Sequence, residues 1–182
     1  MKVTPLNLPV AFLIEPVVHK DNRGFFMESF NEAVLGGQGV KFNFVQDNQS
    51  LSTEPGVVRG LHYQLNPKAQ NKLIRVLTGA IYDVIVDVRK SSPTFGKWVG
   101  VILSEHNHRQ LLVPKGFAHG FCTLVPNTQV LYKVDEYYSP EHDRGILWSD
   151  PVLGIDWPTS NPILSYKDQR HPLLKDAEMN FE

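Results

Sequence analysis

Residues 80–88 read Ala-Ile-Tyr-Asp-Val-Ile-Val-Asp-Val and carry the pattern that decides the fold. Apolar or aromatic side chains occupy every even position, whereas Asp83 and Asp87 interrupt the isoleucines at the odd positions. Because successive side chains of a β-strand point to opposite faces, this alternation predicts a strand. We expect one face to be core and the other to direct its carboxylates toward solvent or toward partner groups.

Similar short runs of strand-forming residues occur along most of the chain, separated by Pro, Gly, Asn and Asp. Many short strands at close spacing, with few helical segments, are typical of β-sandwiches and barrels. We therefore expect one mainly β domain over residues 1–182, with short helices at 31–35 and 172–178 and a tail, residues 150–182, that wraps the barrel. The expected strands span residues 25–30, 41–47, 57–65, 72–77, 80–89, 97–103, 110–113, 117–125 and 128–134.

Composition and charge exclude several classes of protein. The chain has 18 basic and 19 acidic side chains among 182 residues, a formal net charge of −1, so we expect no nucleic-acid partner, which usually requires a clearly basic face. No apolar run is long enough to span a bilayer or to form a secretory signal, so we expect no membrane association and a cytoplasmic location. Cys122 is the only cysteine, which excludes an internal disulfide and a cysteine-based zinc site.

Three polar side chains fall on strand faces that are otherwise apolar. Lys72, His119 and Tyr132 each alternate in phase with two apolar residues of the same predicted strand. A polar group on an interior face is costly unless it is hydrogen-bonded or lines a wet cavity. Each one alone is explained by a structural role, such as a tyrosine hydroxyl bound to a backbone carbonyl. The three together indicate a polar pocket in the mouth of the barrel.

A fourth candidate, His62, lies in the predicted strand at residues 57–64. Strict alternation places it in phase with Val58, Gly60 and Gln64, and places Arg59 on the opposite face. Gly60 in mid-strand permits a bulge or the close approach of a ligand. If His62 and Arg59 serve one site, a bulge near Gly60 is required.

Residues 114–119, Pro-Lys-Gly-Phe-Ala-His, resemble the second signature of the cupin jelly rolls, in which Pro-x-Gly-x-x-His leads into a strand. Metal-binding cupins pair that histidine with an earlier His-x-His and a glutamate. Here the earlier segment offers His62 and Gln64, one imidazole where two are needed. His106 and His108 do form a His-x-His, but they lie in a polar turn. We therefore expect a cupin-like fold without a metal.

Eight segments, in order along nearly the whole chain, resemble the dTDP-4-dehydrorhamnose 3,5-epimerase family. Each is short, and the ordered set is specific. The resemblance implies a cupin-like jelly-roll barrel, a homodimer that exchanges N-terminal strands, and a dTDP-linked 4-keto-6-deoxysugar as substrate. The segments span residues 21–28, 46–50, 58–64, 70–73, 83–89, 114–121, 132–133 and 164–168.

The same resemblance implies roles for particular residues. It implies that His62 is a general base with Asp168 as its partner, that Tyr132 is the opposing acid, and that Lys72 lies near the ketone oxygen. Tyr138 stands where some members carry tryptophan, and Asp143 replaces a common glutamate on the substrate-binding side. The residues that the resemblance places around the nucleotide and sugar are Arg23, Glu28, Gln46, Asn48, Arg59 and His119.

The implied reaction removes a proton beside a ketone and returns it on the other face, to invert C3 and C5 of dTDP-4-dehydro-6-deoxy-D-glucose. It needs a base, an acid and a donor at the enolate oxygen, so no cofactor is expected, and the sequence contains no Gly-x-Gly-x-x-Gly fingerprint. Three alternatives stay open: a single-centre epimerase at C3 or C5, a non-catalytic cupin-like module that binds nucleotide sugars, and a metal-dependent cupin.

Overall fold

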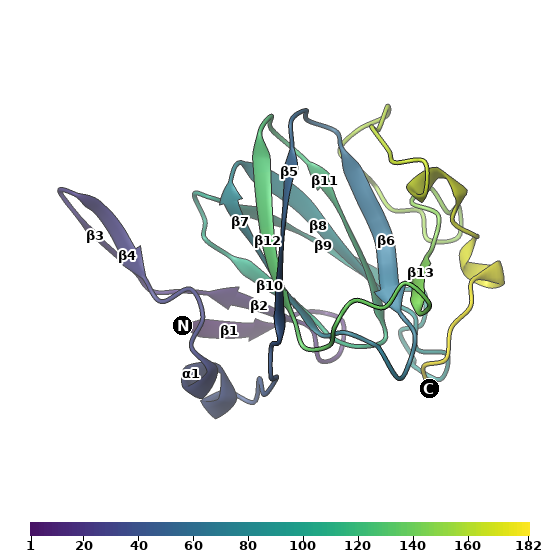
Figure 1. Ribbon diagram of the computed structural model, residues 1–182, viewed down its shortest axis with the longest axis horizontal. Coiled ribbons are helices and arrows are strands. Elements are labelled where there is room, and N and C mark those ends of the chain that lie inside the picture. Colours follow the sequence, from purple (N-terminus) through teal and green to yellow (C-terminus); the bar gives the residue numbers. More distant parts are fainter.

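Two antiparallel β-sheets face each other in the computed structural model, which describes residues 1–182 (Figure 1). A separate two-stranded hairpin, β3 (Val18–Asp21) and β4 (Gly24–Met27), projects away from the barrel. The prediction of a mainly β jelly roll with a few short helices is confirmed.

In sheet order, the six-stranded sheet contains β1 (Lys2–Pro5), β2 (Phe12–Glu15), β10 (Gln110–Val113), β7 (Lys72–Thr78), β12 (Thr128–Val134) and β5 (Gln46–Ser52). The five-stranded sheet contains β13 (Asp143–Gly145), β6 (Val58–Gln64), β11 (Phe117–Thr123), β8 (Ala80–Asp87) and β9 (Trp98–Ser104).

The barrel interior is filled by side chains from both sheets. Ile74 and Val130 come from the six-stranded sheet and Ile81, Ile85 and Phe121 from the five-stranded sheet, and all five belong to one buried cluster. Burial of this apolar area is the main term that holds the two sheets together. The odd positions of β8 therefore face the barrel interior.

The even positions Val84 and Val86 of β8 are also buried, because the C-terminal segment covers the outer face of the five-stranded sheet (Figure 1). Val84 and Val86 pack in one cluster with Trp157, Met179 and Phe181. Both faces of β8 are therefore covered. Its carboxylates do not reach solvent: Asp83 and Asp87 are fully buried and pair with neighbouring side chains, the second of the two outcomes expected from the sequence.

Most strands lie close to the predicted ranges, but the N-terminal part of the chain departs from them. The predicted strand at 41–47 is wrong, because residues 41–45 have no regular structure and β5 begins at Gln46. That stretch contributes Phe42 and Phe44 to an aromatic cluster with Phe30 on the outer side of the six-stranded sheet. Apolar packing, and not strand pairing, explains the alternation there. The sequence analysis did not predict β1, β2, β3 or β13.

The helices are short, as predicted. α1 (Glu32–Gly37) begins after Asn31, whose side-chain oxygen accepts a hydrogen bond of 3.1 Å from the Val34 amide and so caps the helix. The expected C-terminal helix at 172–178 is only a 3-10 turn, η2 (Leu174–Asp176). A second 3-10 turn, η1 (Asp168–Arg170), precedes it.

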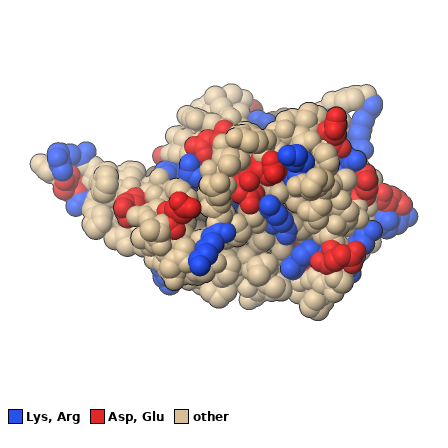
Figure 2. All heavy atoms as spheres, turned by 60° about the horizontal axis from the view of Figure 1, so that its bottom comes forward, with Lys and Arg blue, Asp and Glu red and all other residues tan.

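No helix has the length and apolar character needed to cross a membrane. Figure 2 shows acidic and basic side chains interspersed on one face of the molecule.

Candidate active site

A cavity of about 550 Å³ opens between the two sheets. β5, β7 and β12 line it from the six-stranded sheet, β6 and β11 line it from the five-stranded sheet, and residues 163–168 of the C-terminal segment close one side. Six of the twelve predicted site residues lie in its wall. They are Arg59, His62, Lys72, His119, Tyr132 and Asp168.

A bulge in β6 brings Arg59 and His62 to the same cavity. His62 pairs with His119 of β11 and Arg59 pairs with Phe121, so two residues of β6 lie opposite one residue of β11. The bulge contains Gly60, whose φ is +128° and whose added Cβ would lie 2.5 Å from the Cα of the facing Gly120. Only glycine fits such a position.

The bulge also corrects the phase predicted for β6. Strict alternation put His62 in phase with Val58, but Val58 packs with Leu61 and Tyr63 on the outer, tail-covered face. His62 instead shares the interior face with Arg59. The extra residue in the bulge reverses the alternation between the two ends of the strand.

His62 and Asp168 form a close imidazole–carboxylate pair. Nε2 of His62 lies 2.5 Å from Oδ1 of Asp168, which leaves Nδ1 as the ring nitrogen without a partner in the protein. Burial lowers the pKa of His62, and the hydrogen bond and charge of Asp168 oppose that shift. Burial alone would raise the pKa of Asp168, but the neighbouring His171 and His62 rings outweigh it and hold that pKa below its ordinary range. The carboxylate is therefore ionised and the imidazole largely neutral near pH 7.

Lys72 and Tyr132 come from the sheet opposite His62. Lys72 lies on β7, and burial lowers its pKa to about 8, although nearby carboxylates oppose this. Tyr132 lies on β12, and burial raises the pKa of its phenol, which stays protonated at neutral pH. His62 and Tyr132 therefore face the cavity from opposite walls, the imidazole largely neutral and the phenol protonated.

His119 is buried beside His62 on the neighbouring strand. Its Nε2 lies 2.6 Å from Oδ1 of Asp83, whose other oxygen has no hydrogen-bond partner. This pair explains why β8 carries a carboxylate on an interior face. The aspartate fixes the ring of His119 at the cavity wall.

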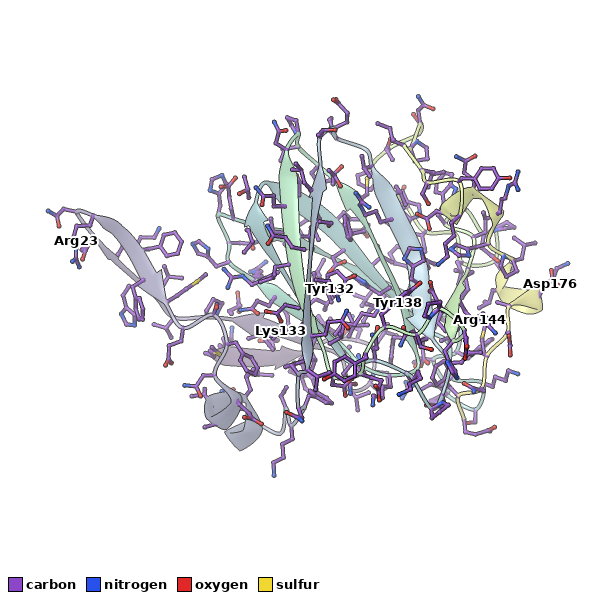
Figure 3. All side chains as sticks on the ribbon, in the orientation of Figure 1. Arg23, Tyr132, Lys133, Tyr138, Arg144 and Asp176 are labelled. Atoms are coloured by element: carbon purple, nitrogen blue, oxygen red, sulfur yellow. The ribbon has the colours of Figure 1, made fainter.

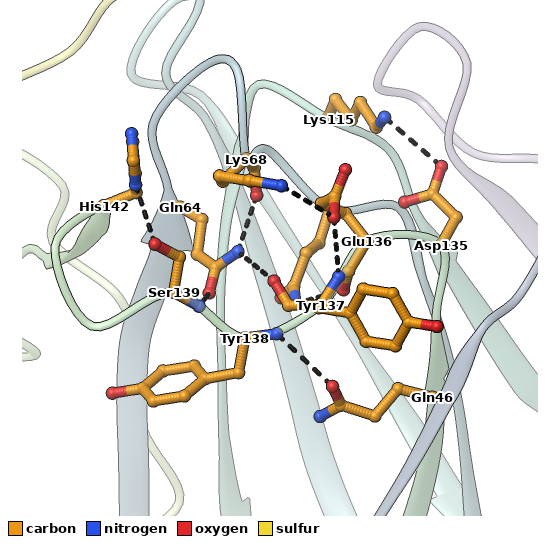
Figure 4. Close-up of polar contacts among 11 residues, drawn as sticks. Gln46, Gln64, Lys68, Lys115, Asp135, Glu136, Tyr137, Tyr138, Ser139 and His142 are labelled. Atoms are coloured by element: carbon orange, nitrogen blue, oxygen red, sulfur yellow. Dashed lines mark hydrogen bonds and ion pairs between the residues drawn. The ribbon is translucent and has the colours of Figure 1, made fainter.

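The remaining predicted residues of the barrel lie at the rim of the site. Gln46 and Asn48 lie on the inner side of β5, where the Gln46 amide donates to Oδ1 of Asn48 at 2.8 Å. The Tyr138 amide donates to the Gln46 side chain at 3.3 Å, which ties the loop after β12 to β5 (Figure 4). The Tyr138 hydroxyl donates to Asp143 at 3.1 Å, and Asp143 also pairs with Lys167 of the cavity wall.

Buried Gln64 also anchors this loop through hydrogen bonds to its backbone (Figure 4). Its amide nitrogen donates to the carbonyl oxygens of Lys68 and Tyr137, and its carbonyl accepts from the Ser139 amide at 2.8 Å. The glutamine that stands where metal-binding cupins carry their second histidine is thus used to anchor a loop.

The structure does not bring Arg23 and Glu28 to the cavity of their own chain. Arg23 lies at the tip of the β3–β4 hairpin, far from Tyr132 (Figure 3), and pairs with Asp21. Glu28 accepts a hydrogen bond of 3.2 Å from Asn31 and does not line the cavity. The hairpin also exposes Phe26, with 69% of its surface accessible. An exposed aromatic side chain on a projecting arm is typical of a contact surface.

His171 is a residue of the site that the sequence analysis missed. His62, Asp168 and His171 offer ligand atoms that all lie within 4.8 Å of one another. Ligands on one tetrahedral zinc are roughly 3.3 Å apart. The 2.5 Å contact between His62 and Asp168 therefore fits a hydrogen-bonded pair better than a preformed metal site.

The two-sheet barrel and its polar interior cavity place the chain in the cupin-like class of jelly-roll proteins. The sequence model of a family described as dTDP-4-dehydrorhamnose 3,5-epimerase matches residues 5–176. The chain therefore belongs to the dTDP-4-dehydrorhamnose 3,5-epimerase family.

Individual relatives agree with this assignment. A dTDP-4-dehydrorhamnose 3,5-epimerase from Shigella flexneri is 54% identical over 179 residues, which cover 98% of each chain. A crystal structure of the Bacillus anthracis epimerase with TDP and PPi bound is 64% identical, with a TM-score of 0.93 over 94% of this chain and 98% of that one. A Legionella pneumophila epimerase in complex with dTDP-4-keto-L-rhamnose is 46% identical, with a TM-score of 0.92 over 96% of this chain and 93% of that one.

Proposed function

We propose that this chain inverts C3 and C5 of dTDP-4-dehydro-6-deoxy-D-glucose, giving dTDP-4-dehydro-L-rhamnose without a cofactor. The observation that carries the proposal is the placement of His62 and Tyr132 on opposite walls of one cavity that also contains Lys72. Inversion beside a ketone requires proton removal on one face of the ring and proton return on the other. Family membership and the nucleotide-sugar ligands of the solved relatives support the choice of substrate.

In this proposal His62 is the base. Its Nδ1 takes the proton from the carbon next to the ketone, while Nε2 stays bonded to Asp168. The carboxylate orients the ring and stabilises the imidazolium that forms. A neutral imidazole suits this step near pH 7, and burial keeps His62 in that form.

Lys72 supplies the positive charge at the enolate oxygen. A buried ammonium group is a strong electrostatic partner for an oxyanion because little water screens it. Tyr132 then donates its phenolic proton to the opposite face of the carbon. The two side chains come from neighbouring strands, β7 and β12, of the sheet opposite His62.

Nucleotide and sugar recognition is assigned to the remaining residues. Arg59 projects into the cavity from the bulge and suits the diphosphate, because a guanidinium group donates two parallel hydrogen bonds to phosphate oxygens. His119 is the second cavity residue assigned to the sugar nucleotide. The residues assigned to the rim are Gln46, Asn48, Tyr138 and Asp143.

Arg23 and Glu28 are assigned to the site of a partner subunit in a homodimer that exchanges its N-terminal strands. The projecting hairpin and its exposed Phe26 support this assignment. Light scattering should then give twice the mass of one chain. Mixing Arg23→Ala and His62→Ala subunits should restore activity, because one site of the mixed dimer has both residues intact. A monomeric mass, or no restoration after subunit exchange, would argue against it. A cytoplasmic location stays a prediction.

Proton NMR of the product formed in D2O tests the reaction. Deuterium at both C3 and C5 with both centres inverted supports the proposal, and exchange at only one centre supports the single-centre alternative. His62→Ala should abolish turnover and retain dTDP binding. Wild-type turnover by that variant would favour another base, and a wild-type protein that binds dTDP-sugar without turnover would favour the non-catalytic module.

A further inference from the structure

We propose that His171 is a positioning residue that holds the Asp168 carboxylate against His62; this inference rests on the proposed base role of His62. The side chain of His171 is 8% exposed, and its Nε2 lies 3.4 Å from Oδ1 of Asp168, the same oxygen that contacts His62. A carboxylate oxygen has two lone pairs, so one oxygen can accept hydrogen bonds from two rings. The chemistry assigned to the dyad therefore involves a third side chain.

The local backbone places His171 on Asp168. Asp168 begins the 3-10 turn η1, and side chains at positions i and i+3 of such a turn lie one above the other. The Leu147 amide donates to the carbonyl oxygen of Pro172 at 2.8 Å and fixes the chain directly after His171. The spacing of three residues therefore places the imidazole of His171 next to the carboxylate of Asp168.

Nε2 of His171 forms no hydrogen bond elsewhere in the protein. The atom is buried and makes no hydrogen bond within the usual geometric limits, so Asp168 is its nearest polar partner. A buried N–H group without a partner destabilises the protein, which favours closing the 3.4 Å gap between Nε2 of His171 and Oδ1 of Asp168. Catalytic hydrogen bonds are often long in the unliganded enzyme and shorten in the substrate complex.

Gly145 makes room for the ring. It lies directly opposite His62 in the pairing of β13 with β6, and a Cβ atom built on it would overlap the ring atoms of His171. Its φ is not positive, so the backbone accepts alanine, and the three atoms nearest the added Cβ all belong to the ring of His171. The His171 ring packs edge-on to His62 with 5.3 Å between centroids. The glycine and the histidine therefore form one supporting wall behind the base.

His171 also lines a second cavity of about 400 Å³. Its charged side chains are Asp143, Arg144, Lys167, Arg170 and Glu178. Arg144 pairs with Glu178 and Lys167 pairs with Asp143, which leaves Asp168 as the carboxylate in contact with His171. A His171 ring that donates its Nε2 proton to Asp168 fits these surroundings.

Two substitutions separate hydrogen bonding from packing. His171→Phe keeps a flat ring and removes the donor, and we expect kcat to fall roughly 10–100-fold with KM unchanged. His171→Gln keeps a donor near the Nε2 position, and we expect kcat within about threefold of wild type. The acidic limb of the rate profile should move to lower pH in His171→Phe, because a loosely held Asp168 no longer supports the pKa of His62, and should stay in place in His171→Gln.

Gly145→Ala provides an independent test, because it displaces the ring and leaves His171 in the chain. It should reproduce the loss of kcat, and combining His171→Phe with Asp168→Asn should cost nothing beyond Asp168→Asn alone. Equal loss in the Gln and Phe variants, or full activity in His171→Phe, would overturn the inference. If His62→Ala is inactive and His171→Phe is fully active, only the role of His171 is refuted. If His62→Ala is active, the proposed base is refuted.

Discussion

Arg59 and His62 are three residues apart on β6, yet both side chains line the same cavity. In a regular strand this separation places two side chains on opposite faces. The bulge at Gly60 adds one residue and turns both of them inward. The proposed phosphate ligand and the proposed base therefore both depend on the glycine that lies between them in the strand.

Gly60→Ala should damage both stability and activity. The new Cβ would meet the Gly120 backbone, and alanine is strained at a φ of +128°. We expect the free energy of unfolding to fall by at least about 2 kcal/mol, measured by urea denaturation. Gly37→Ala, where the added Cβ meets no atom within 4 Å, is the matched control and should be neutral or stabilising. Equal stability of the two variants would contradict the role assigned to the bulge.

We predict that Lys72 sets the alkaline limb of the rate profile. Its pKa is lowered to about 8 by burial, so the ammonium form is lost as the pH rises through that value. We expect kcat to fall above about pH 8. Lys72→Met should lower kcat roughly 10²–10³-fold at pH 7 and remove this limb. Lys68→Met, which breaks only a half-exposed pair with Glu136, should do neither.

The lowered pKa of Lys72 also affects stability. The unfolded chain has the ordinary lysine value of 10.5 and binds more protons than the folded chain between about pH 8 and that value. Stability therefore rises with pH across this window as far as Lys72 is concerned. Urea denaturation of wild type and Lys72→Met at pH 8 and pH 10 should show this rise only in the wild type. A parallel pH response in both would contradict the assigned pKa.

Asp168→Asn should make His62 a weaker base and leave the rest of the site in place. The carboxylate opposes the effect of burial on His62, so its removal lowers the pKa of His62 further. We expect kcat to fall roughly 10²–10⁴-fold and the acidic limb of kcat/KM to move to lower pH. Asp176→Asn, on the exposed surface of the C-terminal segment, is the control (Figure 3). An acidic limb that moves upward would refute the pairing.

The sequence predicted the cavity because side chains alternate regularly between the two faces of the strands that carry Lys72, His119 and Tyr132. It failed at β6 because a bulge depends on the partner strand, here on Gly120 of β11, which local alternation cannot reveal. The buried Asp83 was left undecided for a similar reason. Its partner, His119, lies 36 residues further along the chain.

The C-terminal part of the site could not be derived from spacing. Asp168 and His62 are 106 residues apart, and only the family resemblance joined them. His171 was missed, although its spacing of three from Asp168 is visible in the sequence, because that spacing matters only once the 3-10 turn is known.

Deuterium incorporation by Tyr132→Phe tests the central claim most directly. With the phenol absent and His62 intact, the base can still remove and return the proton on its own face. Incubation in D2O should therefore label recovered dTDP-4-dehydro-6-deoxy-D-glucose beside the ketone, while little inverted product forms. Inversion at the wild-type rate would contradict the account of an imidazole and a phenol acting from opposite walls.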